Sequence, residues 1–562
     1  MKRLSKIVIC SILILTVLSV TIMANIILAE TNVDNETFYV GVTYGGDTVE
    51  GAKQLIDKVK DYTTLFILQS GPLAANSEAI NEIGDYACAA NLKYAIMGST
   101  KSSHECGINN RSLEAKARWG EQFIGIYYMD EPGGNILDNG ATDIQALTTV
   151  NNVTTAITKT TDGAIKVSEF YGDYLSMHTN VSTYFPDGKI TIQKYYSEEI
   201  FEQGSNSLSE ENKPLVGTIF GSFRELTVKI NYYPNGTITI EERIDEGIIE
   251  GDDTNTTYIG VKSDINFYAP ENITKCLYEI RSYEAILKQH PIQTIDDAAK
   301  FFVNSNKYRL ELINKEQLQE EAILVFTSDY SLYWWDYQSG YDLVLAQLGW
   351  NNSITQEIGL VRGAANLQDK SWGTILTWKY THAPFLTDGE EMFEQMKTSY
   401  EAGAKYVIIF NYSEDPTNPN TLQEEHFDAL ERFWVEVVEN PQVIPGSIKA
   451  EAVLVLPINY GWGMRNPQDR IWGIWDADDM SQRIWDEVQS RLAQYGSKLD
   501  IVYDDPAYPV AGRYNNIHYI TNVFPYVWII AAILLLPITA GILLFYFKRR
   551  KNKTTKQATL VL

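Results

Sequence analysis

Residues 123–134 read FIGIYYMDEPGG, an apolar run that ends in two carboxylic acids, a proline and two glycines. Further apolar runs of similar length recur between residues 38 and 440, and amphipathic stretches separate them. Short, nearly continuous apolar runs rich in Ile, Val, Phe and Tyr are typical of parallel strands that are covered on both faces. The eight predicted strands are Phe38–Thr43, Thr64–Gln69, Lys93–Met97, Phe123–Met129, Ile165–Phe170, Ala322–Thr327, Thr374–Trp378 and Tyr406–Asn411.

Helical patterns lie between these strands. They are Val49–Asp61, Ser77–Ala90, Ser112–Gln122, Thr142–Thr158, Lys275–Val303, a helical region within Gly340–Leu367, Gly389–Ala402 and Gln423–Val438. Eight strand–helix units in one α/β chain favour a closed TIM-like (β/α)8 barrel over its alternative, a doubly wound open sheet. We predict that residues 30–179 form the first part of the barrel and residues 273–445 the second.

The segment between the two barrel parts has a different character. Residues 180–272 alternate polar and β-branched side chains, and the pieces 184–192 and 232–240 resemble each other. Each piece carries a turn signal, Pro-Asp-Gly in one and Pro-Asn-Gly in the other, which indicates hairpins. The pattern predicts a β-rich insertion after strand five, on the loop side where barrels carry their active sites.

The chain after residue 445 predicts a small α/β appendage at residues 446–505. It consists of a strand at Ala452–Pro457, a helix at Met480–Tyr495 and a second strand at Lys498–Tyr503. Residues 506–525 then form a short stalk. We expect the appendage to pack on the flank of the barrel.

Both ends of the chain predict membrane targeting. Residues 1–29 combine an early basic cluster with an apolar run, which is typical of a signal peptide or an N-terminal anchor. Residues 526–547 carry no charge and are long enough to span a bilayer, and the tail 548–562 begins with Lys548, Arg549 and Arg550. Because such cations stay on the cytoplasmic side, we predict a single-pass protein of the cell membrane with an extracellular N-terminal domain and one transmembrane helix that contacts the lipid bilayer.

Glycosylation signals agree with that placement. Asn-x-Ser/Thr sequons occur at Asn35, Asn110, Asn152, Asn180, Asn235, Asn255, Asn272, Asn351 and Asn411. The net charge of −26 excludes nucleic acid as an expected partner, because phosphate binding requires a basic surface. The spacing of Cys88 and Cys106 allows one disulfide outside the cytoplasm, and we predict no metal site and no cofactor.

The strand ends carry carboxylates and many aromatic side chains. Pairs of carboxylates catalyse reactions at acetal centres, and aromatic rings stack on the apolar faces of sugars. Together they indicate a carbohydrate or glycoconjugate as the partner. The predicted stacking residues are Tyr44, Tyr127, Tyr171, Trp334, Trp335, Trp378 and Tyr380.

The sequence Asp130-Glu131-Pro132 at the end of strand four resembles the barrel glycoside hydrolases, in whose largest clan that strand ends in Asn-Glu-Pro. The resemblance covers the barrel architecture and this short motif, and it implies that Glu131 is the acid/base. The clan's second carboxylate, a Glu at the end of strand seven, has no counterpart here, since that strand ends in Trp378, Lys379 and Tyr380.

We therefore expect Glu131 to act with Asp130 beside it and with Asp329 or Glu169 as base or nucleophile; Glu414 is a further alternative. The expected function is that of a membrane-tethered glycoside-hydrolase-like protein acting on glycans. The alternative is a non-catalytic glycan-binding or envelope structural protein built on a barrel that lost its nucleophile. A cation held by Asp130 and Glu131 is a weaker reading, because two adjacent residues alone make a poor site.

Overall fold

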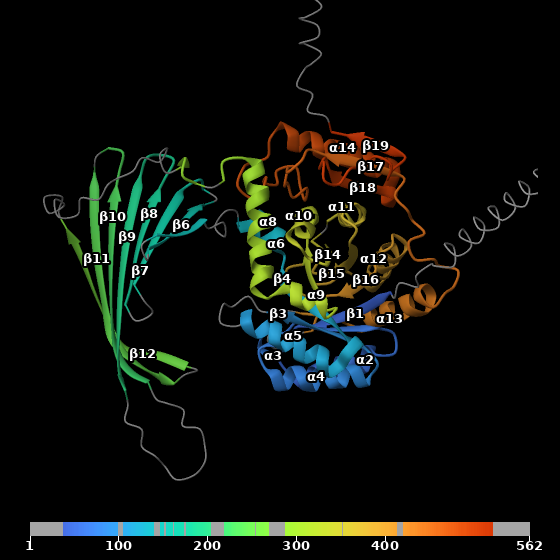
Figure 1. Ribbon diagram of the computed structural model, residues 1–562, viewed down its shortest axis with the longest axis horizontal. Helices are drawn as coiled ribbons and strands as arrows, with labels where there is room; N and C mark the ends of the chain where they lie inside the picture. The colour runs from blue at the N-terminus through green and yellow to red at the C-terminus, as the bar shows by residue number, and fades with distance from the viewer. Residues whose placement is uncertain are drawn as a thin grey trace, which may run out of the picture. The chain divides into compact units, whose positions relative to one another are not determined.

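A computed structural model describes residues 38–98, 105–139, 146–150, 153–160, 162–172, 176–203, 219–235, 237–252, 255–268, 287–290, 292–350, 352–412 and 420–520 (Figure 1). The predicted segments 1–29 and 526–547 and the tail 548–562 lie outside these ranges. Within the ranges, no helix has the length and apolar character needed to cross a bilayer. The membrane segments therefore remain predictions from the sequence.

Eight strands close into a barrel, and each strand runs parallel to both of its neighbours. The strands are β1 (Tyr39–Tyr44), β2 (Leu65–Leu68), β3 (Lys93–Gly98), β4 (Phe123–Asp130), β13 (Leu324–Asp329), β14 (Leu343–Leu348), β15 (Ser371–Leu376) and β16 (Tyr406–Ile409). The prediction of a TIM-like barrel is thus confirmed.

Helices cover the outside of this barrel (Figure 1). The longer ones are α2 (Val49–Val59), α4 (Ser77–Ala89), α5 (Glu105–Trp119), α8 (Ile295–Leu312), α11 (Ile354–Leu367), α12 (Gly389–Glu401) and α13 (Glu424–Phe433). Shorter ones are α3 (Gly71–Ala74), α6 (Pro132–Asn139), α9 (Lys315–Glu320) and α10 (Tyr333–Ser339). Side chains from the strands fill the interior, where Ile67, Tyr127, Phe326 and Ile408 belong to one buried cluster. The barrel is a packed core, so a ligand site has to lie at one of its ends.

One strand assignment made from the sequence was wrong, and one barrel strand was missed. Ile165–Phe170 lies in β7 (Ile165–Gly172) of a separate antiparallel sheet, not in the barrel. The barrel strand that was missed is β14, which precedes α11 (Ile354–Leu367), the helix expected within Gly340–Leu367. The insertion consequently follows the fourth barrel strand and not the fifth. A short apolar run looks alike in both settings, because the pattern does not specify which strand will pair with it.

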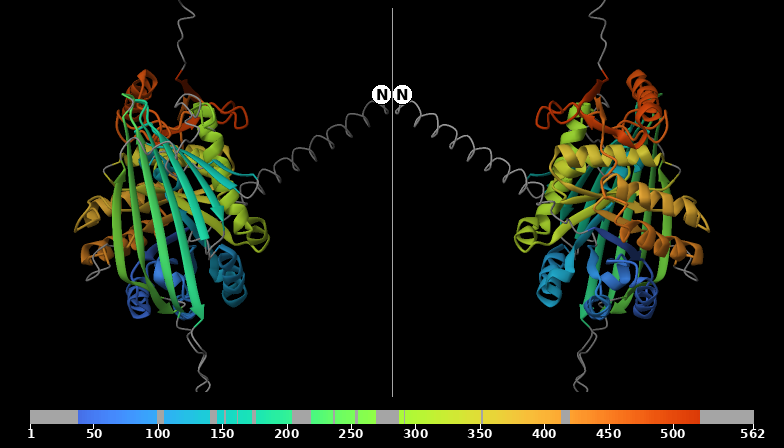
Figure 2. Two further views of the ribbon diagram at one scale, coloured as in Figure 1. Left: turned by 90° about the vertical axis from the view of Figure 1, so that its left-hand side faces the viewer. Right: turned by 90° about the vertical axis from the view of Figure 1, so that its right-hand side faces the viewer.

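The insertion forms an eight-stranded antiparallel sheet in the order β12-β11-β10-β9-β8-β7-β6-β5, seen face-on in the left view of Figure 2. Besides β7, its strands are β5 (Ala146–Val150), β6 (Val153–Lys159), β8 (Ser176–Tyr184), β9 (Ile190–Gln203), β10 (Ile219–Tyr232), β11 (Ile238–Asp252) and β12 (Asn255–Tyr268). The sheet begins earlier than the predicted residue 180, and the predicted helix Thr142–Thr158 is a hairpin of two strands.

The predicted hairpins at the two similar pieces are present. The first connects β8 to β9 through Asp187 and Gly188, where Gly188 has φ +88° and the Asp187 carboxylate accepts the backbone N–H of Lys189 at 2.9 Å. The second connects β10 to β11, and Asn235 accepts the N–H of Thr237 at 3.0 Å. Side chains that bond their own turn in this way stabilise tight connections.

The appendage contains β17 (Ala452–Leu456), α14 (Asp479–Tyr495), β18 (Leu499–Tyr503) and β19 (Asn516–Tyr519), with the strand order β18-β17-β19. The last strand lies within the predicted stalk 506–525. A buried ion pair joins the appendage to the barrel: Arg362 of α11 contacts Asp500 of β18 at 2.7 Å. The same guanidinium donates to the carbonyls of Ser497 and Leu499. Because both charges are buried and bonded on several sides, this contact orders the two parts together.

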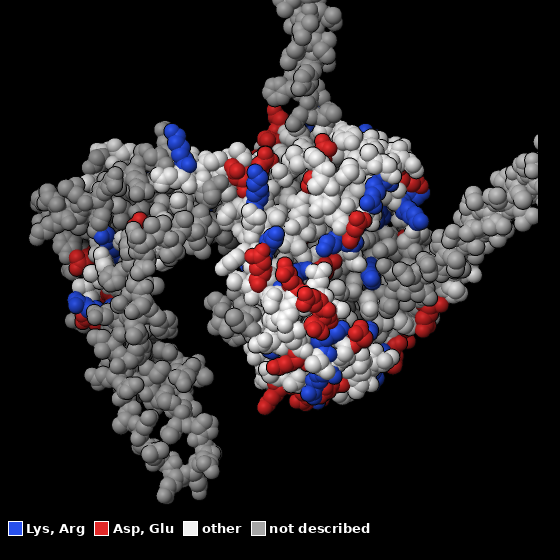
Figure 3. Space-filling model, in the orientation of Figure 1, with Lys and Arg blue, Asp and Glu red and all other residues white. Residues whose placement is uncertain are grey.

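Charged side chains are distributed over the surface in both signs. On the face shown in Figure 3, acidic and basic residues of the barrel and appendage are interspersed, and no broad basic area lies among the described residues of that face.

Candidate active site

Strand β4 leaves its regular geometry just before the two acids. Its register against β13 shifts between Phe326 and Ser328, which marks an irregularity of the β-bulge type. Met129 and Glu131 have φ values of +59° and +52°, in the left-handed region that most side chains avoid. Such strained backbone re-aims the side chains that follow a bulge and is concentrated at functional sites. Here it occurs at the two positions flanking Asp130.

Asp130 is held from one side by a network of hydroxyl groups. Its Oδ1 accepts hydrogen bonds from Tyr127 Oη and from Ser328 Oγ, the latter at 3.0 Å. Gln347 of β14 in turn donates from Nε2 to Ser328 Oγ at 2.9 Å. Burial raises the pKa of Asp130, while the bonds from Tyr127 and Ser328 lower it and favour the carboxylate. The network therefore orients Asp130, and it offsets only part of the effect of burial, so that the pKa of Asp130 stays above its ordinary value.

Glu131 is partly exposed beside this network. Burial raises the pKa of Glu131 to about 8; the negative charge of Asp130 adds to the effect and a hydrogen bond with Gln347 opposes it. A carboxyl group with such a pKa carries its proton at neutral pH. Two neighbouring carboxyl groups with different environments divide the acid and base roles between them. Here burial raises the pKa of both carboxyl groups, and their negative charges repel each other, which favours a proton on one member of the pair.

Asp329, a predicted base or nucleophile, has a structural role instead. It is fully buried at the end of β13, and its two oxygens accept the backbone N–H groups of Gly133, Gly134 and Tyr330. The first two belong to α6, so Asp329 caps the N-terminus of that helix, where a negative charge is favourable. Its position below the surface is unsuited to attack on a substrate.

Two more buried acids lie in this region. Asp336 of α10 is fully buried, and burial together with the charge of Asp329 raises the pKa of Asp336 well above its usual range. Glu357 of α11 is also fully buried, and its carboxylate accepts the hydroxyl of Tyr333 at 2.6 Å. Neither reaches solvent. No group of three or more Asp, Glu, His or Cys side chains suited to a metal ion was found in the described part of the chain.

Glu169, the other predicted partner, lies in β7 of the antiparallel sheet, opposite Asn180 of β8. It was chosen because Ile165–Phe170 was read as a barrel strand. Since that strand belongs to the insertion, barrel closure does not bring Glu169 to the end of β4. Tyr171 lies in the same strand β7. Glu414 lies outside the described residues.

Most of the predicted sugar-stacking residues are buried. Trp334 and Trp335 of α10 are at most 2% exposed, and the Trp335 ring packs against Tyr503 and Trp472 of the appendage at centroid distances of 4.4 and 4.7 Å. Tyr44 is buried and donates to the carbonyl of Thr48 at 2.9 Å. These rings stabilise the fold and present no face to a ligand. Tyr127 is likewise buried and serves the Asp130 network.

An aromatic surface does exist at the ends of β14, β15 and β16. Trp378 lies nearly parallel to Tyr412, at 12° and 6.4 Å between centroids, and Trp350 meets Trp378 at 6.0 Å. Trp350 and Tyr380 are 41% exposed and Tyr412 is 36% exposed. We call Trp350, Trp378, Tyr380 and Tyr412 the aromatic platform. Trp350 and Tyr412 were missed from the sequence, Trp350 because no strand was assigned before it.

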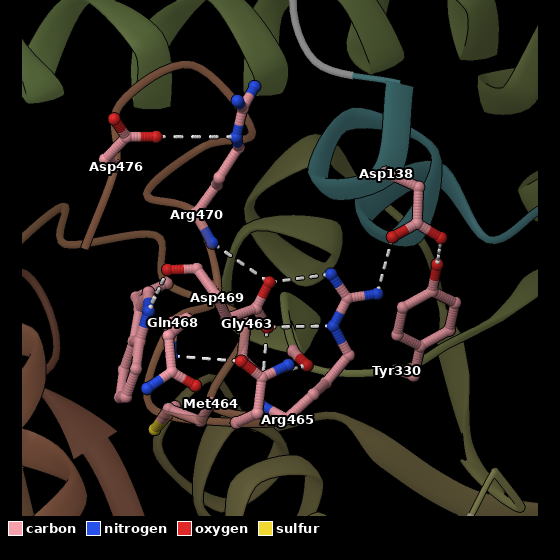
Figure 4. A network of polar contacts seen from close by, with 12 residues as sticks. Asp138, Tyr330, Gly463, Met464, Arg465, Gln468, Asp469, Arg470 and Asp476 are labelled. Atoms are coloured by element: carbon pink, nitrogen blue, oxygen red, sulfur yellow. Dashed lines mark hydrogen bonds and ion pairs between the residues drawn. The ribbon is translucent and has the colours of Figure 1, made fainter. Parts of the chain in front are cut away.

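The appendage packs against α11 on the flank of the barrel, as expected, and its loop also reaches the end of the barrel that carries the acids. In the loop between β17 and α14, Arg465 forms two bonds to Asp469 at 2.7 and 2.8 Å and contacts Asp138 of α6 at 2.6 Å (Figure 4). Tyr330 donates to the other oxygen of Asp138, and Ser331 donates to the carbonyl of Gly463. These contacts hold α6, and with it the segment that carries the two acids, against the loop.

The sequons occupy varied positions. Asn110 and Asn235 are exposed, Asn180 is partly exposed in β8, and Asn255 lies in β12, whereas Asn35, Asn152, Asn272 and Asn351 lie outside the described residues. Asn411 is fully buried, and its amide is bonded to Asn420 and Thr421. The folded chain therefore leaves no room for a glycan at Asn411.

The predicted disulfide between Cys88 and Cys106 stays a prediction. Cys88 is a free thiol with respect to the described side chains, and burial raises its pKa to about 11. The side chain of Cys106 is outside the described part of the chain.

Comparison of the chain with models of protein families, with curated proteins and with solved structures found no match. The function has to be argued from the site.

Proposed function

We propose that this protein is a glycoside hydrolase in which Glu131 is the general acid. The observation that carries the proposal is the partly exposed carboxyl group of Glu131 at the C-terminal end of β4, beside Asp130, where burial raises the pKa of Glu131 to about 8. Cleavage of a glycosidic bond requires a proton on the departing oxygen, and the ideal donor has a pKa near the working pH. The ends of barrel strands are where enzymes of this fold place such groups.

Glu131 donates its proton to the glycosidic oxygen as the bond to the anomeric carbon breaks. Water bonds to the anomeric carbon in place of the departed group, and the proton that this water loses restores the protonated form of Glu131. The aromatic platform offers stacking faces to sugar rings at the same end of the barrel. The uncharged segment 526–547 and the sequons support a membrane-tethered, extracellular enzyme that acts on surface or environmental glycans.

A glycan-binding protein without catalysis is the second candidate. The observation that favours it is the end of β15, the seventh barrel strand, where Thr377, Trp378 and Lys379 stand in place of a carboxylate. The platform alone is sufficient to bind a sugar, because stacking does not require an acid.

The test is glycan release by the full-length protein from a panel of polysaccharides and glycoproteins, compared with Glu131→Gln. We expect a loss of about 10²- to 10⁴-fold in rate for the variant, the usual contribution of a general acid. The control is Glu121→Gln, since Glu121 is exposed and precedes β4 at the opposite end of the same strand. Equal release by parent and Glu131→Gln removes Glu131 from the mechanism. Binding without release by the parent supports the glycan-binding candidate.

A further inference from the structure

A cavity of about 580 Å³ lies between the barrel and the appendage. Small ligands occupy protein cavities of roughly 300 to 1,000 Å³, so this cavity has the size of a ligand site. It is lined by the C-terminal ends of α11 and α12, by the start of β15 and by appendage residues within 446–450 and 513–514. Because each of these helices ends just before a barrel strand begins, the cavity lies at the N-terminal end of the strands, opposite to Glu131.

The cavity is basic, although the whole chain has a net charge of −26. Its lining includes one acid, Asp369, and the cations Arg362, Lys370, Lys449 and Arg513. Arg362 is neutralised by its buried ion pair with Asp500 at 2.7 Å. Arg513 lies 3.6 Å from Asp369, and both side chains are more than half exposed, so this contact is weak. The two lysines are left with the excess positive charge.

The ammonium groups of these lysines are not engaged by the described part of the chain. No ion pair joins Lys370 or Lys449 to a described carboxylate. Carbonyls at the ends of α11 and α12 attract cations, but backbone N–H groups already bond them. The N–H of Lys370 donates to the carbonyl of Ala365 at 2.9 Å, and the N–H of Ile448 donates to that of Glu401 at 2.8 Å.

Lys370 also loses water contacts in this position. Its side chain is partly buried, and burial lowers the pKa of Lys370 because the ammonium form is the one that water stabilises. An anion in the cavity would replace the lost hydration with a direct charge-assisted hydrogen bond.

We propose that the cavity binds a phosphate group through Lys370, Lys449 and Arg513. A phosphate monoester carries a charge of about −1.5 to −2 at neutral pH and three strong acceptor oxygens. That charge balances the two lysines, and the exposed guanidinium of Arg513 offers further donors. A single carboxylate would leave one lysine unbalanced. The volume leaves room for the rest of the molecule that carries the phosphate.

Two sources supply such a group: a small soluble phosphate ester and the headgroup of a phospholipid. Only residues 515–525 separate Tyr514, which lines the cavity, from the predicted membrane segment 526–547. A lipid ligand would make the cavity a second contact with the bilayer. In the experiment glycerol 1-phosphate represents the soluble source, and phosphatidic acid, whose headgroup is also a monoester, represents the lipid.

The experiment measures the acetylation of individual lysines by acetic anhydride, read by mass spectrometry of the full-length protein. In the soluble arm the protein is held in uncharged detergent, with or without glycerol 1-phosphate. In the lipid arm it is held in phosphatidylcholine bilayer discs, with or without phosphatidic acid. We expect the monoester to lower acetylation of Lys370 and Lys449 and to leave Lys300 and Lys307 unchanged, since these two exposed lysines of α8 do not line the cavity.

A pair of matched variants then tests the assignment of the two lysines. The cavity variant, Lys370→Gln with Lys449→Gln, should bind the protecting ligand at least about 10-fold more weakly in a calorimetric titration, because a hydrogen bond to a charged group contributes that much or more. The control variant, Lys300→Gln with Lys307→Gln, removes the same charge elsewhere and should bind like the parent.

The outcomes separate the two sources from failure of the inference. Protection by glycerol 1-phosphate supports a soluble ligand, and protection by phosphatidic acid alone supports a lipid. The inference is overturned if neither ligand protects Lys370 and Lys449, or if the cavity variant binds as tightly as the control variant. Labelling of the parent gives this answer whether or not a variant folds. Glycan release is a separate measurement, because the proposed hydrolysis uses neither lysine.

Discussion

Replacement of Glu357 by Gln should change how the stability of the protein depends on pH. Glu357 is fully buried in the first turn of α11, where its carboxylate accepts the hydroxyl of Tyr333 at 2.6 Å. Burial raises the pKa of Glu357 from 4.5 to about 7, and the bond from Tyr333 opposes that change. A glutamine preserves an oxygen acceptor for Tyr333 and cannot ionise.

The magnitude follows from the two pKa values. A folded-state pKa above the unfolded value means that the folded protein binds the proton more tightly, so stability is lost as pH rises from about 4.5 to about 7. The difference of about 2.5 pH units, at about 1.4 kcal/mol for each, amounts to about 3 kcal/mol. At pH 5 the parent and Glu357→Gln should have similar free energies of unfolding. At pH 8 the variant should be more stable by up to about 3 kcal/mol.

The assay is urea unfolding of both full-length proteins, followed by tryptophan fluorescence at pH 5 and pH 8. Trp334 and Trp335 lie on α10 close to Tyr333 and report on this region. Glu78→Gln, an exposed acid on α4, is the matched control and should follow the parent at both pH values. The reasoning is refuted if Glu357→Gln and the parent lose the same stability between pH 5 and pH 8.

Two further predictions concern the strand end itself. Activity should fall above pH 8 as Glu131 loses its proton. In Asp130→Asn this decline should move to lower pH, because the negative charge that helps to raise the pKa of Glu131 is gone. A pH–rate profile that does not move in the variant contradicts the electrostatic coupling of the two acids. Gly133→Ala should lower the free energy of unfolding by about 1 to 3 kcal/mol, because the added Cβ would lie 2.6 Å from the Asp329 carboxylate that caps α6. The control is Gly71→Ala, whose Cβ would meet nothing within 4 Å and should leave stability unchanged. Thermal unfolding of both variants measures the difference.

Several elements were readable from local pattern alone. The helices α2, α4 and α12 and the strands β1 to β4 lie within a few residues of their predicted bounds, because each shows an uninterrupted apolar run or a helical apolar stripe. The run at residues 343–348 reads LVLAQL and was not assigned to a strand; Leu, Ala and Gln are also good helix formers, so its composition does not distinguish the two states. Only pairing with β13 and β15 identifies it as a strand.

The stretch FIGIYYMDEPGG determined a great deal by itself: a buried strand, a break at the proline, and two acids at the end of the strand that faces the ligand side of a barrel. What each acid does was decided by tertiary contacts. The pKa of Glu131 depends on burial and on Asp130, and the use of Asp329 as a helix cap depends on two glycine N–H groups almost 200 residues earlier in the chain. Periodicity reports which residues are apolar, whereas charge and hydrogen bonding depend on neighbours that only the closed barrel brings together.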